Sequence, residues 1–398
     1  MKTPKPIRTV HVIEKYFYPV AAGIETNILE TYSVLAEKGW DITIHTSKDT
    51  LTEKNVLKDE ETYRGLKIKR QPFRWYSYFP KINYGKADAV CLHNFNIIPH
   101  FYILLYALFL KLIGRKKFIL ILTPHGGFNP EWRIFPAWQA FVKQVYHYTI
   151  GTFLINLTVD GMRAVSEWER EEIIKKGVNA KIVHTISNGI EDEAYADVDA
   201  EASEDIKKKV AEFGRYIIQI GRVYMIKNYE TTLRALTKVP KDVKYIIAGP
   251  VGDNNYLKKL ETLIKELNLE ERVIFLGVIR GIDKYYLIKH AQMMVHMALW
   301  ESFCNVVHEG MSQGLICIVA NNTALPLLIK NGINGYCVET QDDAGVAEKI
   351  NYVLEHKNSD EMKKMQAVNR EFGLEMSWRK VSQKMFDLYT NLYTRIHS

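Results

Sequence analysis

Short apolar runs alternate with amphipathic stretches along almost the whole chain, and this alternation constrains the fold more than any other feature of the sequence. The apolar runs predict strands at residues 8–13, 41–46, 66–70, 89–93, 118–123, 163–166, 181–187, 216–221, 244–249, 272–277 and 293–296. Residues 25–38, 255–267 and 284–290 have helical spacing instead, and another helix is predicted from Tyr229. Because alternating strands and helices build parallel sheets with helices on both faces, we expect an α/β fold with doubly wound parallel sheets.

The length of the chain indicates two domains. Its 398 residues exceed one ordinary α/β domain and fit two domains of roughly 200 residues each. The predicted boundary is Asn188-Gly189-Ile190, which is followed by an acidic segment at residues 191–205. We therefore predict a first domain over residues 1–190 and a second over residues 191–375.

Cysteine usage and the first residues indicate a cytoplasmic protein. The four cysteines form no CxxC pair and indicate neither a disulfide framework nor a zinc site. The start of the chain does not resemble a signal peptide. No apolar run reaches the roughly 18–20 residues that span a bilayer.

The positive charge of the chain is concentrated in one region. Residues 62–150 hold 13 basic residues and only two acids, Asp88 and Glu131, a net charge of 13 − 2 = +11, against +7 for the whole chain. The same region holds 20 of the 46 aromatic residues. Basic and aromatic side chains together suit a surface that rests on anionic lipid headgroups. They could also suit nucleic acid, but the sequence contains no nucleic-acid-binding motif, so we expect a membrane partner and no nucleic acid.

Two apolar segments in this region could face lipid. Residues 97–113 are almost entirely apolar and are followed by Arg115. They are either a helix buried against the sheet or a helix that partly faces lipid, with residues 115–117 at the headgroups. Residues 131–154, with Trp132, Trp138 and several Phe and Tyr residues, are a second candidate.

A pair of glutamates lies between the apolar run at residues 293–299 and a further predicted strand at residues 315–320. Glu301 lies in a loop after the first of these runs, and Glu309 lies in a helix predicted to begin near Asn305. Ligands of open α/β sheets bind beyond the carboxyl ends of the strands, and a helix N-terminus attracts phosphate. Acids on both sides of such an anion site suggest a ligand that is half polyol and half phosphate. An ordinary amphipathic helix with solvated acids explains the spacing equally well.

A second candidate phosphate-binding motif lies about 80 residues before Glu301. Gly221-Arg222 follows a predicted strand, and Lys227 precedes the next helix. Glycine lets the backbone approach a ligand, while an arginine fork and a lysine charge together can hold a diphosphate. The motif gains specificity only when it is combined with Glu301 and Glu309.

With these residues in place, the chain resembles the retaining glycosyltransferases of the GT-B fold, family four. The resemblance covers nearly the whole chain, and its motifs occur in the order of the family. They are the glycine loop of residues 18–25 with Gly23, the His125-Gly126 element, Ser166, Asn188-Gly189-Ile190, Gly221-Arg222 with Lys227, and Glu301 through Glu309. The resemblance implies two Rossmann-like domains facing across a cleft, a first for the acceptor and a second for the nucleotide sugar. It also implies that residues 376–398 form a helix that crosses back to the first domain.

The resemblance also assigns roles to residues. Arg222 and Lys227 would neutralise the diphosphate leaving group, Glu301 would contact hydroxyls of the sugar, and His125 would lie near its 6-hydroxyl. These four are the predicted catalytic residues. The predicted donor-binding residues, with Glu309 on the ribose, are Gly23, Gly221, Cys304, Asn305, Val306 and Glu309. Cys304 departs from the glycine or proline common at its position, and Ala22 from a second glycine.

The predicted reaction transfers a hexose-type sugar with retention and without a metal. Asp197-Val198-Asp199 resembles a metal-binding DxD motif but lies in the acidic connecting segment, and we interpret it as surface. No cofactor is expected beside the donor, for which a UDP-sugar is favoured and GDP-mannose is the alternative. We expect a lipid-linked or membrane-proximal acceptor and peripheral association with the cytoplasmic membrane face. The alternatives are a soluble small acceptor, a catalytically silent GT-B binding protein, and another GT-B enzyme such as an epimerase or an inverting transferase.

Overall fold

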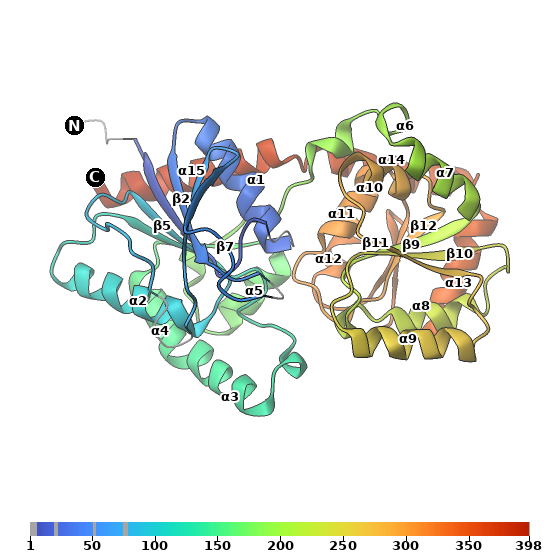
Figure 1. Ribbon diagram of the computed structural model, residues 1–398, viewed down its shortest axis with the longest axis horizontal. Helices are drawn as coiled ribbons and strands as arrows, with labels where there is room; N and C mark the ends of the chain where they lie inside the picture. The colour runs from blue at the N-terminus through green and yellow to red at the C-terminus, as the bar shows by residue number, and fades with distance from the viewer. Residues whose placement is uncertain (1–5, 20–22, 51–52, 75–78, 398) are drawn as a thin grey trace. The chain divides into compact units, whose positions relative to one another are not determined.

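The chain folds into two compact units (Figure 1). The computed structural model describes residues 6–19, 23–50, 53–74 and 79–397. The first unit comprises Met1–Gly189 together with Trp378–Ser398, and the second comprises Ile190–Ser377. The last helix of the chain is therefore part of the first unit.

The first unit is built on an eight-stranded sheet in the order β3-β4-β2-β1-β5-β6-β7-β8. Its strands are β1 (Thr9–Ile13), β2 (Asp41–Ser47), β3 (Glu60–Tyr63), β4 (Leu66–Gln71), β5 (Ala89–His93), β6 (Ile119–Thr123), β7 (Gly161–Ala164) and β8 (Val183–Thr185). The strands are parallel except for β3, which pairs antiparallel with β4. The sequence analysis missed β3 because its residues, Glu-Glu-Thr-Tyr, form no apolar run.

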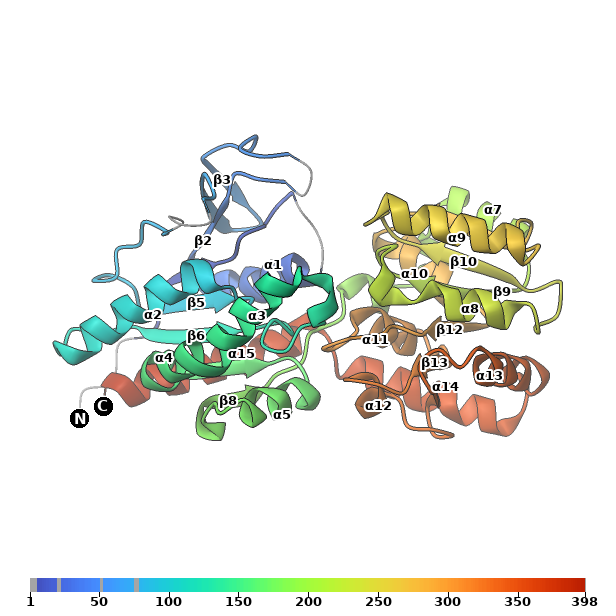
Figure 2. The same cartoon turned by 90° about the horizontal axis from the view of Figure 1, so that it is seen from below.

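Helices cover both faces of this sheet. They are α1 (Gly23–Glu37), α2 (Ile97–Leu112), α3 (Ala137–Tyr146), α4 (Thr152–Thr158), α5 (Glu167–Lys175) and α15 (Trp378–His397). The unit also contains the short 3-10 helices η1 (Trp132–Ile134) and η3 (Ala180–Ile182) and the π-helix η2 (His147–Gly151), which joins α3 to α4. Side chains of α1 and α15 share one core cluster, while those of α2 and α4 belong to another. Figure 2 shows α2 and α4 in front of the sheet.

The second unit contains a six-stranded parallel sheet in the order β11-β10-β9-β12-β13-β14. Its strands are β9 (Tyr216–Ile220), β10 (Lys244–Ala248), β11 (Val273–Gly277), β12 (Met293–His296), β13 (Cys317–Ala320) and β14 (Gly335–Val338). Numbered within the unit, this is the 3-2-1-4-5-6 order of dinucleotide-binding folds. The predicted α/β class with doubly wound parallel sheets is confirmed.

The helices of the second unit also lie on two faces, with α10, α11 and α14 on one side and α8, α9 and α13 on the other (Figure 1). Their bounds are α6 (Val198–Glu201), α7 (Glu204–Phe213), α8 (Tyr229–Leu236), α9 (Asn254–Glu266), α10 (Gly281–Lys289), α11 (Asn305–Ser312), α12 (Leu325–Leu328), α13 (Asp343–Glu355) and α14 (Asp360–Leu374). Two short turns, η4 (Asp192–Tyr195) and η5 (Met225–Lys227), complete the unit.

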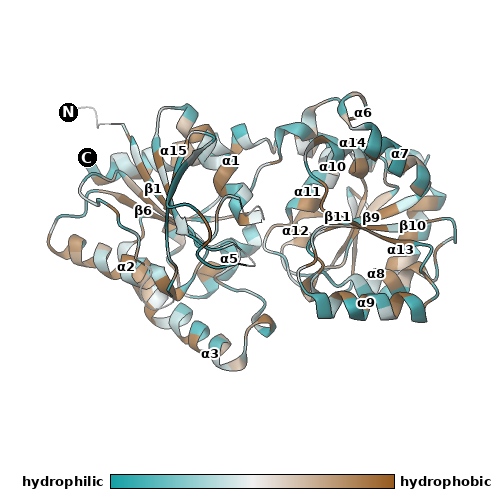
Figure 3. Ribbon diagram, viewed as in Figure 1, coloured by the Kyte–Doolittle hydropathy of each residue, from teal (hydrophilic) through white to brown (hydrophobic). Residues whose placement is uncertain are grey.

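The apolar segment at residues 97–113 is neither fully buried nor fully exposed. Its helix α2 buries Ile103, Leu104 and Ala107 in the core. The other side exposes Leu105, Tyr106, Phe109, Leu112 and Ile113. Figure 3 shows brown, apolar stretches on α2, whereas α3 alternates between brown and teal. Over the described residues, no helix is long and apolar enough to cross a membrane.

The second apolar segment, residues 131–154, is not one helix. It divides into η1, α3, η2 and the start of α4. Pro136 immediately precedes α3. Because proline has no backbone N–H and its ring clashes with the preceding turn, a helix cannot run through this position, and α3 begins after it. The segment still exposes Trp138, Phe141, Val142, Val145, Ile150 and Phe153.

Candidate active site

The predicted phosphate and sugar residues of the second unit follow two neighbouring strands. Strand β9 is paired with β10 on one side and with β12 on the other. Successive strands are added to one side of β9 up to β11 and to its other side from β12 onward, so the strand order reverses between β9 and β12. Gly221, Arg222 and Lys227 follow β9, and Glu301 follows β12. Such a switch point is where open α/β sheets bind ligands.

The loop after β9 depends on two glycines. A Cβ on Gly221 would lie 3.3 Å from Cε of Lys227, tighter than most real contacts, so the glycine leaves room for the lysine chain. A Cβ on Gly249 would overlap the carbonyl of Gly221. The two backbones therefore pack directly on each other and hold the loop in place.

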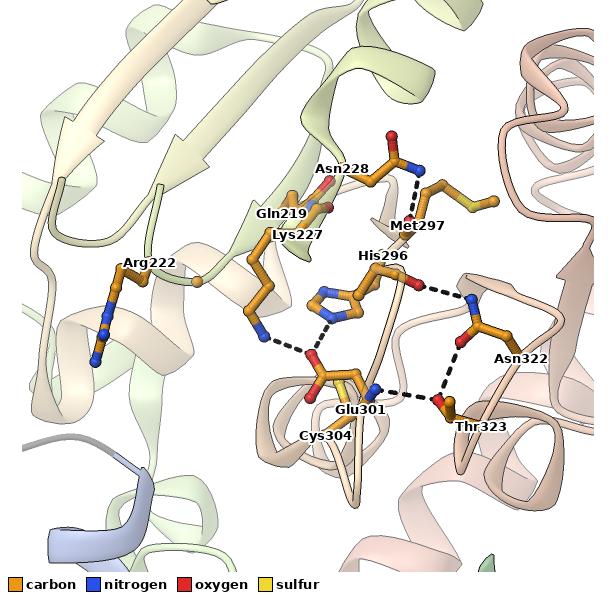
Figure 4. Close-up of polar contacts among 12 residues, drawn as sticks. Gln219, Arg222, Lys227, Asn228, His296, Met297, Glu301, Cys304, Asn322 and Thr323 are labelled. Atoms are coloured by element: carbon orange, nitrogen blue, oxygen red, sulfur yellow. Dashed lines mark hydrogen bonds and ion pairs between the residues drawn. The ribbon is translucent and has the colours of Figure 1, made fainter. Parts of the chain in front are cut away.

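Lys227 and Glu301 meet at the centre of this site (Figure 4). The Lys227 Nζ atom forms an ion pair with Oε1 of Glu301. The His296 Nε2 atom lies 2.8 Å from the same oxygen, and the His296 side chain is fully buried at the end of β12. His296 was not predicted, although a polar residue closing a buried apolar strand is a usable signal.

The environment keeps this ion pair charged. Burial opposes the charge on Glu301, but Lys227 and His296 outweigh it and lower the pKa of the Glu301 carboxyl to about 2. Burial also opposes the charge on Lys227, yet the Glu301 carboxylate raises the pKa of Lys227 above its usual value. Burial lowers the pKa of His296, so this imidazole is neutral and donates its Nε2 proton to the carboxylate.

The backbone of Glu301 is fixed by residues from the neighbouring strand. Its N–H donates to Oγ1 of Thr323 at 3.0 Å, and the Asn322 side chain bonds both Thr323 and the carbonyl of Ala298. Asn322 and Thr323 lie in the loop after β13. The sequence analysis missed them because their partners are brought close only by the sheet order.

Arg222 lies apart from the Lys227–Glu301 pair (Figure 4). Its side chain is exposed, and its stem packs over Gly252, where a Cβ would overlap the arginine. The guanidinium has no ion pair with any residue that the structure describes. Arg222 nevertheless lies close enough to Lys227 to oppose its protonation. The site thus contains one paired cation and one exposed cation on the same loop.

Glu309 lies in α11, where one of its oxygens accepts from Lys284 Nζ at 3.2 Å. The same Nζ atom lies 2.6 Å from Glu191. Burial and then Glu191 raise the pKa of Glu309, against the effect of Lys284. The other oxygen, Oε2, is buried and has no hydrogen-bond partner among the described residues. A buried acceptor of this kind is costly unless a donor satisfies it, and a ribose hydroxyl is such a donor.

The remaining predicted donor-binding residues begin α11. Cys304 is the N-cap and has a left-handed backbone with φ +72°, a conformation that glycine adopts without strain. Asn305 and Val306 form the first turn of α11. The start of a helix carries a partial positive charge, which here lies beside Glu301 because Cys304 and Glu301 have ligand atoms within 4.8 Å of each other.

Three potential metal ligands lie together in the same place. Ligand atoms of His296, Glu301 and Cys304 all lie within 4.8 Å of one another. However, Oε1 of Glu301 already accepts from both Lys227 and His296. Burial raises the pKa of the Cys304 thiol well above its usual value, so the thiol is protonated. A lysine ammonium thus lies where a metal ion would need the carboxylate.

The DxD-like segment is a surface feature. The Asp197 side chain caps α6, and Asp199 pairs with Lys289 at 2.6 Å and with His290 at 2.9 Å. About half of the Asp199 side chain is exposed.

His125 lies in the first unit, at the end of β6, with φ +51°. Its Nε2 atom lies 2.8 Å from Nδ1 of His93, and the other nitrogen of His93 lies 2.9 Å from the Tyr32 hydroxyl. That hydroxyl lies 2.9 Å from the hydroxyl of Tyr389 in α15. Burial lowers the pKa of His125 to about 3, so the ring is neutral. The contact of His125 with His93, and that of His93 with Tyr32, were not predicted.

The other first-unit motifs have structural contacts. Gly23 begins α1, and the preceding residues 20–22 lie outside the described part of the chain. Ser166 caps α5 by accepting from the amide of Glu169. Asn188 accepts from Arg163 and from Asn27.

Two doubly wound parallel sheets, with a lysine–glutamate pair at the switch point of the second, define the GT-B class of glycosyltransferases. The solved structure of the Anabaena protein HepE in complex with UDP-glucose has the same fold, with a TM-score of 0.74 and 17% identity over 96% of this chain and 99% of that chain.

Family comparisons identify both halves of the chain. Residues 201–371 match the model of glycosyl transferases group 1, and residues 21–194 match that of Glycosyltransferase Family 4. The chain belongs to this glycosyltransferase family.

Two curated relatives illustrate its range. N-acetyl-alpha-D-glucosaminyl L-malate synthase of Bacillus anthracis is 27% identical over 233 residues, which are 56% of this chain and 56% of that protein. The match to that relative therefore spans little more than half of its length. GDP-mannose:cellobiosyl-diphosphopolyprenol alpha-mannosyltransferase of Xanthomonas oryzae pv. oryzae is 24% identical over 96% of both chains.

Proposed function

We propose that this glycosyltransferase moves a hexose-type sugar from a UDP-sugar to an acceptor hydroxyl with retention of configuration and without a metal ion. The observation that carries the proposal is the charged Lys227–Glu301 pair beside the start of α11. The cation suits a diphosphate, and the carboxylate suits sugar hydroxyls. Glu309, with its unpaired buried oxygen, suits the ribose.

In this mechanism the bond between the sugar C1 and the diphosphate oxygen breaks, and the diphosphate keeps the electron pair. Lys227 and Arg222 stabilise the charge that develops there, which is usually the largest catalytic effect in such sites. The acceptor oxygen then bonds to C1 on the same face, and its proton passes to the departing phosphate oxygen. An enzyme that cleaves glycosides by hydrolysis would instead need two carboxylates flanking the bond.

A UDP-sugar is favoured because HepE was solved with UDP-glucose, while the Xanthomonas relative is named for GDP-mannose. The reaction is tested by incubating the full chain with UDP-glucose and octyl glucoside, then determining the anomeric configuration of the product by NMR. An α-linked product formed equally well in EDTA supports the proposal. A β-linked product, or loss of turnover in EDTA, would contradict it. Absence of turnover with every nucleotide sugar would favour a silent binding protein.

We further propose a lipid-linked acceptor and association with an anionic membrane. Helix α2 and residues 137–158 expose a set of large apolar side chains, here called the apolar face: Leu105, Tyr106, Phe109, Leu112, Ile113, Trp138, Phe141, Val142, Val145, Ile150 and Phe153. Large apolar side chains exposed on neighbouring elements are typical of surfaces that bind a partner or a membrane. Lys111, Arg115 and Lys117 lie at the end of α2 and suit lipid phosphates.

Vesicle flotation tests this association. We expect the chain to float with anionic vesicles at low salt, and a double variant, Phe109→Glu with Phe153→Glu, to remain in the dense fraction. Val368→Glu serves as the control because Val368 is 41% exposed in α14 of the second unit. Equal flotation of all variants would contradict the proposed face, and no flotation of the wild type would favour a soluble acceptor.

A further inference from the structure

Strand β12 is apolar except for its last residue, His296. The other residues of the strand, Met293, Met294 and Val295, are fully buried. The His296 side chain is fully buried as well, and its Nδ1 atom has no hydrogen-bond partner among the described residues. A buried polar atom without a partner is costly, and an apolar side chain would avoid that cost. A residue that breaks the local pattern in this way, beside a candidate active site, indicates a functional role.

The single ring proton of His296 is on Nε2. Burial, reinforced by the charge of Lys227, lowers the pKa of His296 despite the opposing effect of Glu301, so the ring is neutral. Its Nε2 atom lies 2.8 Å from Oε1 of the Glu301 carboxylate, which can only accept. A proton on Nδ1 would instead place two lone pairs against each other and leave a buried N–H without an acceptor.

Two donors from different elements occupy the same oxygen of Glu301. Lys227, in the segment after β9, forms an ion pair with Oε1, and His296, at the end of β12, donates to the same atom. Each oxygen of a carboxylate offers about two acceptor positions. The protein itself therefore fills both positions of Oε1, and this oxygen has none left for a ligand.

The second oxygen of Glu301 is in the opposite situation. Oε2 makes no hydrogen bond or ion pair with a described residue, and it keeps contact with solvent, the Glu301 side chain being 12% exposed. In Figure 4 the contacts of Lys227 and His296 converge on one oxygen of Glu301, while the other oxygen carries none. Glu301 thus presents one charged acceptor to a ligand.

Lys227 alone would not select between the two oxygens. An ammonium group has three donors and no fixed plane, so a lysine can pair with either oxygen of a carboxylate or with both. The His296 ring is rigid and enclosed in the core, and it donates to one oxygen only. The histidine therefore removes the rotational freedom that the ion pair leaves to the Glu301 carboxylate.

We propose that His296 is a positioning residue, which holds Oε1 of Glu301 so that Oε2 faces the hydroxyls of the transferred sugar. The assignment of that ligand as a donor sugar rests on the proposed function. His296 does not touch the ligand and acts only through Glu301. Its removal should therefore weaken the contact with the sugar and leave the contacts with the nucleotide unchanged.

The test compares the affinities of the full chain for UDP and for UDP-glucose by calorimetry, and their ratio measures the contribution of the sugar. We expect His296→Leu to lower this contribution about tenfold, as for the loss of one hydrogen bond to a charged group, and to keep the affinity for UDP. His296→Gln should retain most of the contribution, because its amide nitrogen lies as many bonds from Cβ as Nε2 of histidine and also donates. An equal loss in both variants would overturn the proposal.

A double variant separates positioning from a structural effect. If His296 acts only through Glu301, His296→Leu should cause no further loss of the sugar contribution once Glu301→Gln is present. A further loss would overturn the proposal. The control is Asn369→Leu, since Asn369 is also fully buried in the second unit. It bonds the carbonyls of Leu315 and Asn334, which precede β13 and β14 at the opposite end of the sheet, so the sugar contribution should equal that of the wild type.

The tautomer of His296 tests the geometry without any ligand. In protein labelled with nitrogen-15 in its histidines, we expect the ring proton on Nε2, in a signal that is absent from His296→Gln. A proton on Nδ1 would overturn the proposal whatever the chain binds. A sugar contribution that falls in Glu301→Gln but not in His296→Leu would make this inference alone wrong. The expected tautomer without binding of UDP or UDP-glucose, or without any effect of Glu301→Gln, would contradict the proposed function, and the inference that rests on it would fail as well.

Discussion

At the scale of single residues, one carboxylate oxygen organises the candidate active site. Oε1 of Glu301 contacts both Lys227 and His296, and its backbone is held by Thr323. The lysine charge is thus fixed in place before a ligand arrives. Preorganised charge is what stabilises a developing negative charge without reorganisation.

Replacing Lys227 tests this preorganisation. We expect Lys227→Ala to lower kcat by about 100- to 1000-fold, the usual effect of removing one preorganised group that stabilises transition-state charge. The control is Lys238→Ala, because Lys238 forms a comparable ion pair with Asp343 but is 52% exposed. A kcat within a few-fold of the wild type in Lys227→Ala, measured by nucleotide release, would count against the assigned role.

The pKa of Glu301 also predicts how stability depends on pH. Its value of about 2 in the folded state lies below the ordinary 4.5, so its contribution is present above pH 4.5 and is lost as the pH falls toward 2. In urea unfolding, the stability difference between the wild type and Glu301→Gln should be about 2 kcal/mol smaller at pH 3 than at pH 7. A difference that does not change with pH would show that Glu301 is not held as a charged partner.

At position 304 we expect glycine to stabilise the protein more than alanine does, which is the reverse of the usual order in and near helices. At φ +72° a side chain costs about 1–2 kcal/mol that glycine avoids. We expect the free energy of unfolding of Cys304→Gly to be about 1 kcal/mol higher than that of Cys304→Ala. Both variants lose the same sulfur atom, so the comparison isolates the backbone effect. Chemical unfolding measures the pair. A more stable alanine variant would contradict the left-handed backbone at this position.

At the scale of elements, the last helix, α15, packs against residues that are far away in the sequence. It packs a row of buried side chains into the first unit: Trp378, Val381, Met385, Leu388, Tyr389, Leu392 and Tyr393. Tyr389 stacks on Trp40 with ring centres 5.7 Å apart, and Trp378 occupies the space that a side chain at Gly189 would need. The Asn188-Gly189 motif therefore has a packing role in addition to any role in binding.

Removing α15 should unfold the first unit. Its seven buried apolar and aromatic side chains are worth about 1.5–3 kcal/mol each, or about 10–21 kcal/mol together, which matches or exceeds the usual net stability of about 5–15 kcal/mol. We expect a chain that stops at Ser377 to lose the cooperative transition of the first unit in calorimetry. The control is deletion of residues 394–398, which are exposed where described. A preserved first transition in the long deletion would contradict this packing.

At the scale of the whole molecule, the features that could be predicted from the sequence are those that depend on short stretches of the chain. Apolar runs located most strands of both sheets but not β3 or β14, and Gly221, Lys227 and Glu301 were placed on the loops that the structure brings together. The polar strand β3 was missed because its pairing comes from a hairpin through Arg64 and Gly65, both with positive φ.

Partners that are distant in the chain were also missed. Lys284 contacts Glu191, 93 positions earlier, and only the folded sheet determines that proximity. His93 and His125 meet because β5 and β6 are neighbours, and each residue alone gives no sign of the other.

The measurement that tests the central claim most directly is thermal unfolding of the full chain with UDP, GDP and ADP in turn. A nucleotide at about 100 times its Kd should add ~3 kcal/mol to the stability of the unit that binds it. We predict a clear rise in Tm with UDP that is lost in Lys227→Ala and in Glu309→Ala and is kept in Lys238→Ala. No rise with any nucleotide at millimolar concentration, or a UDP shift that survives both site variants, would contradict a nucleotide-sugar site at Lys227, Glu301 and Glu309.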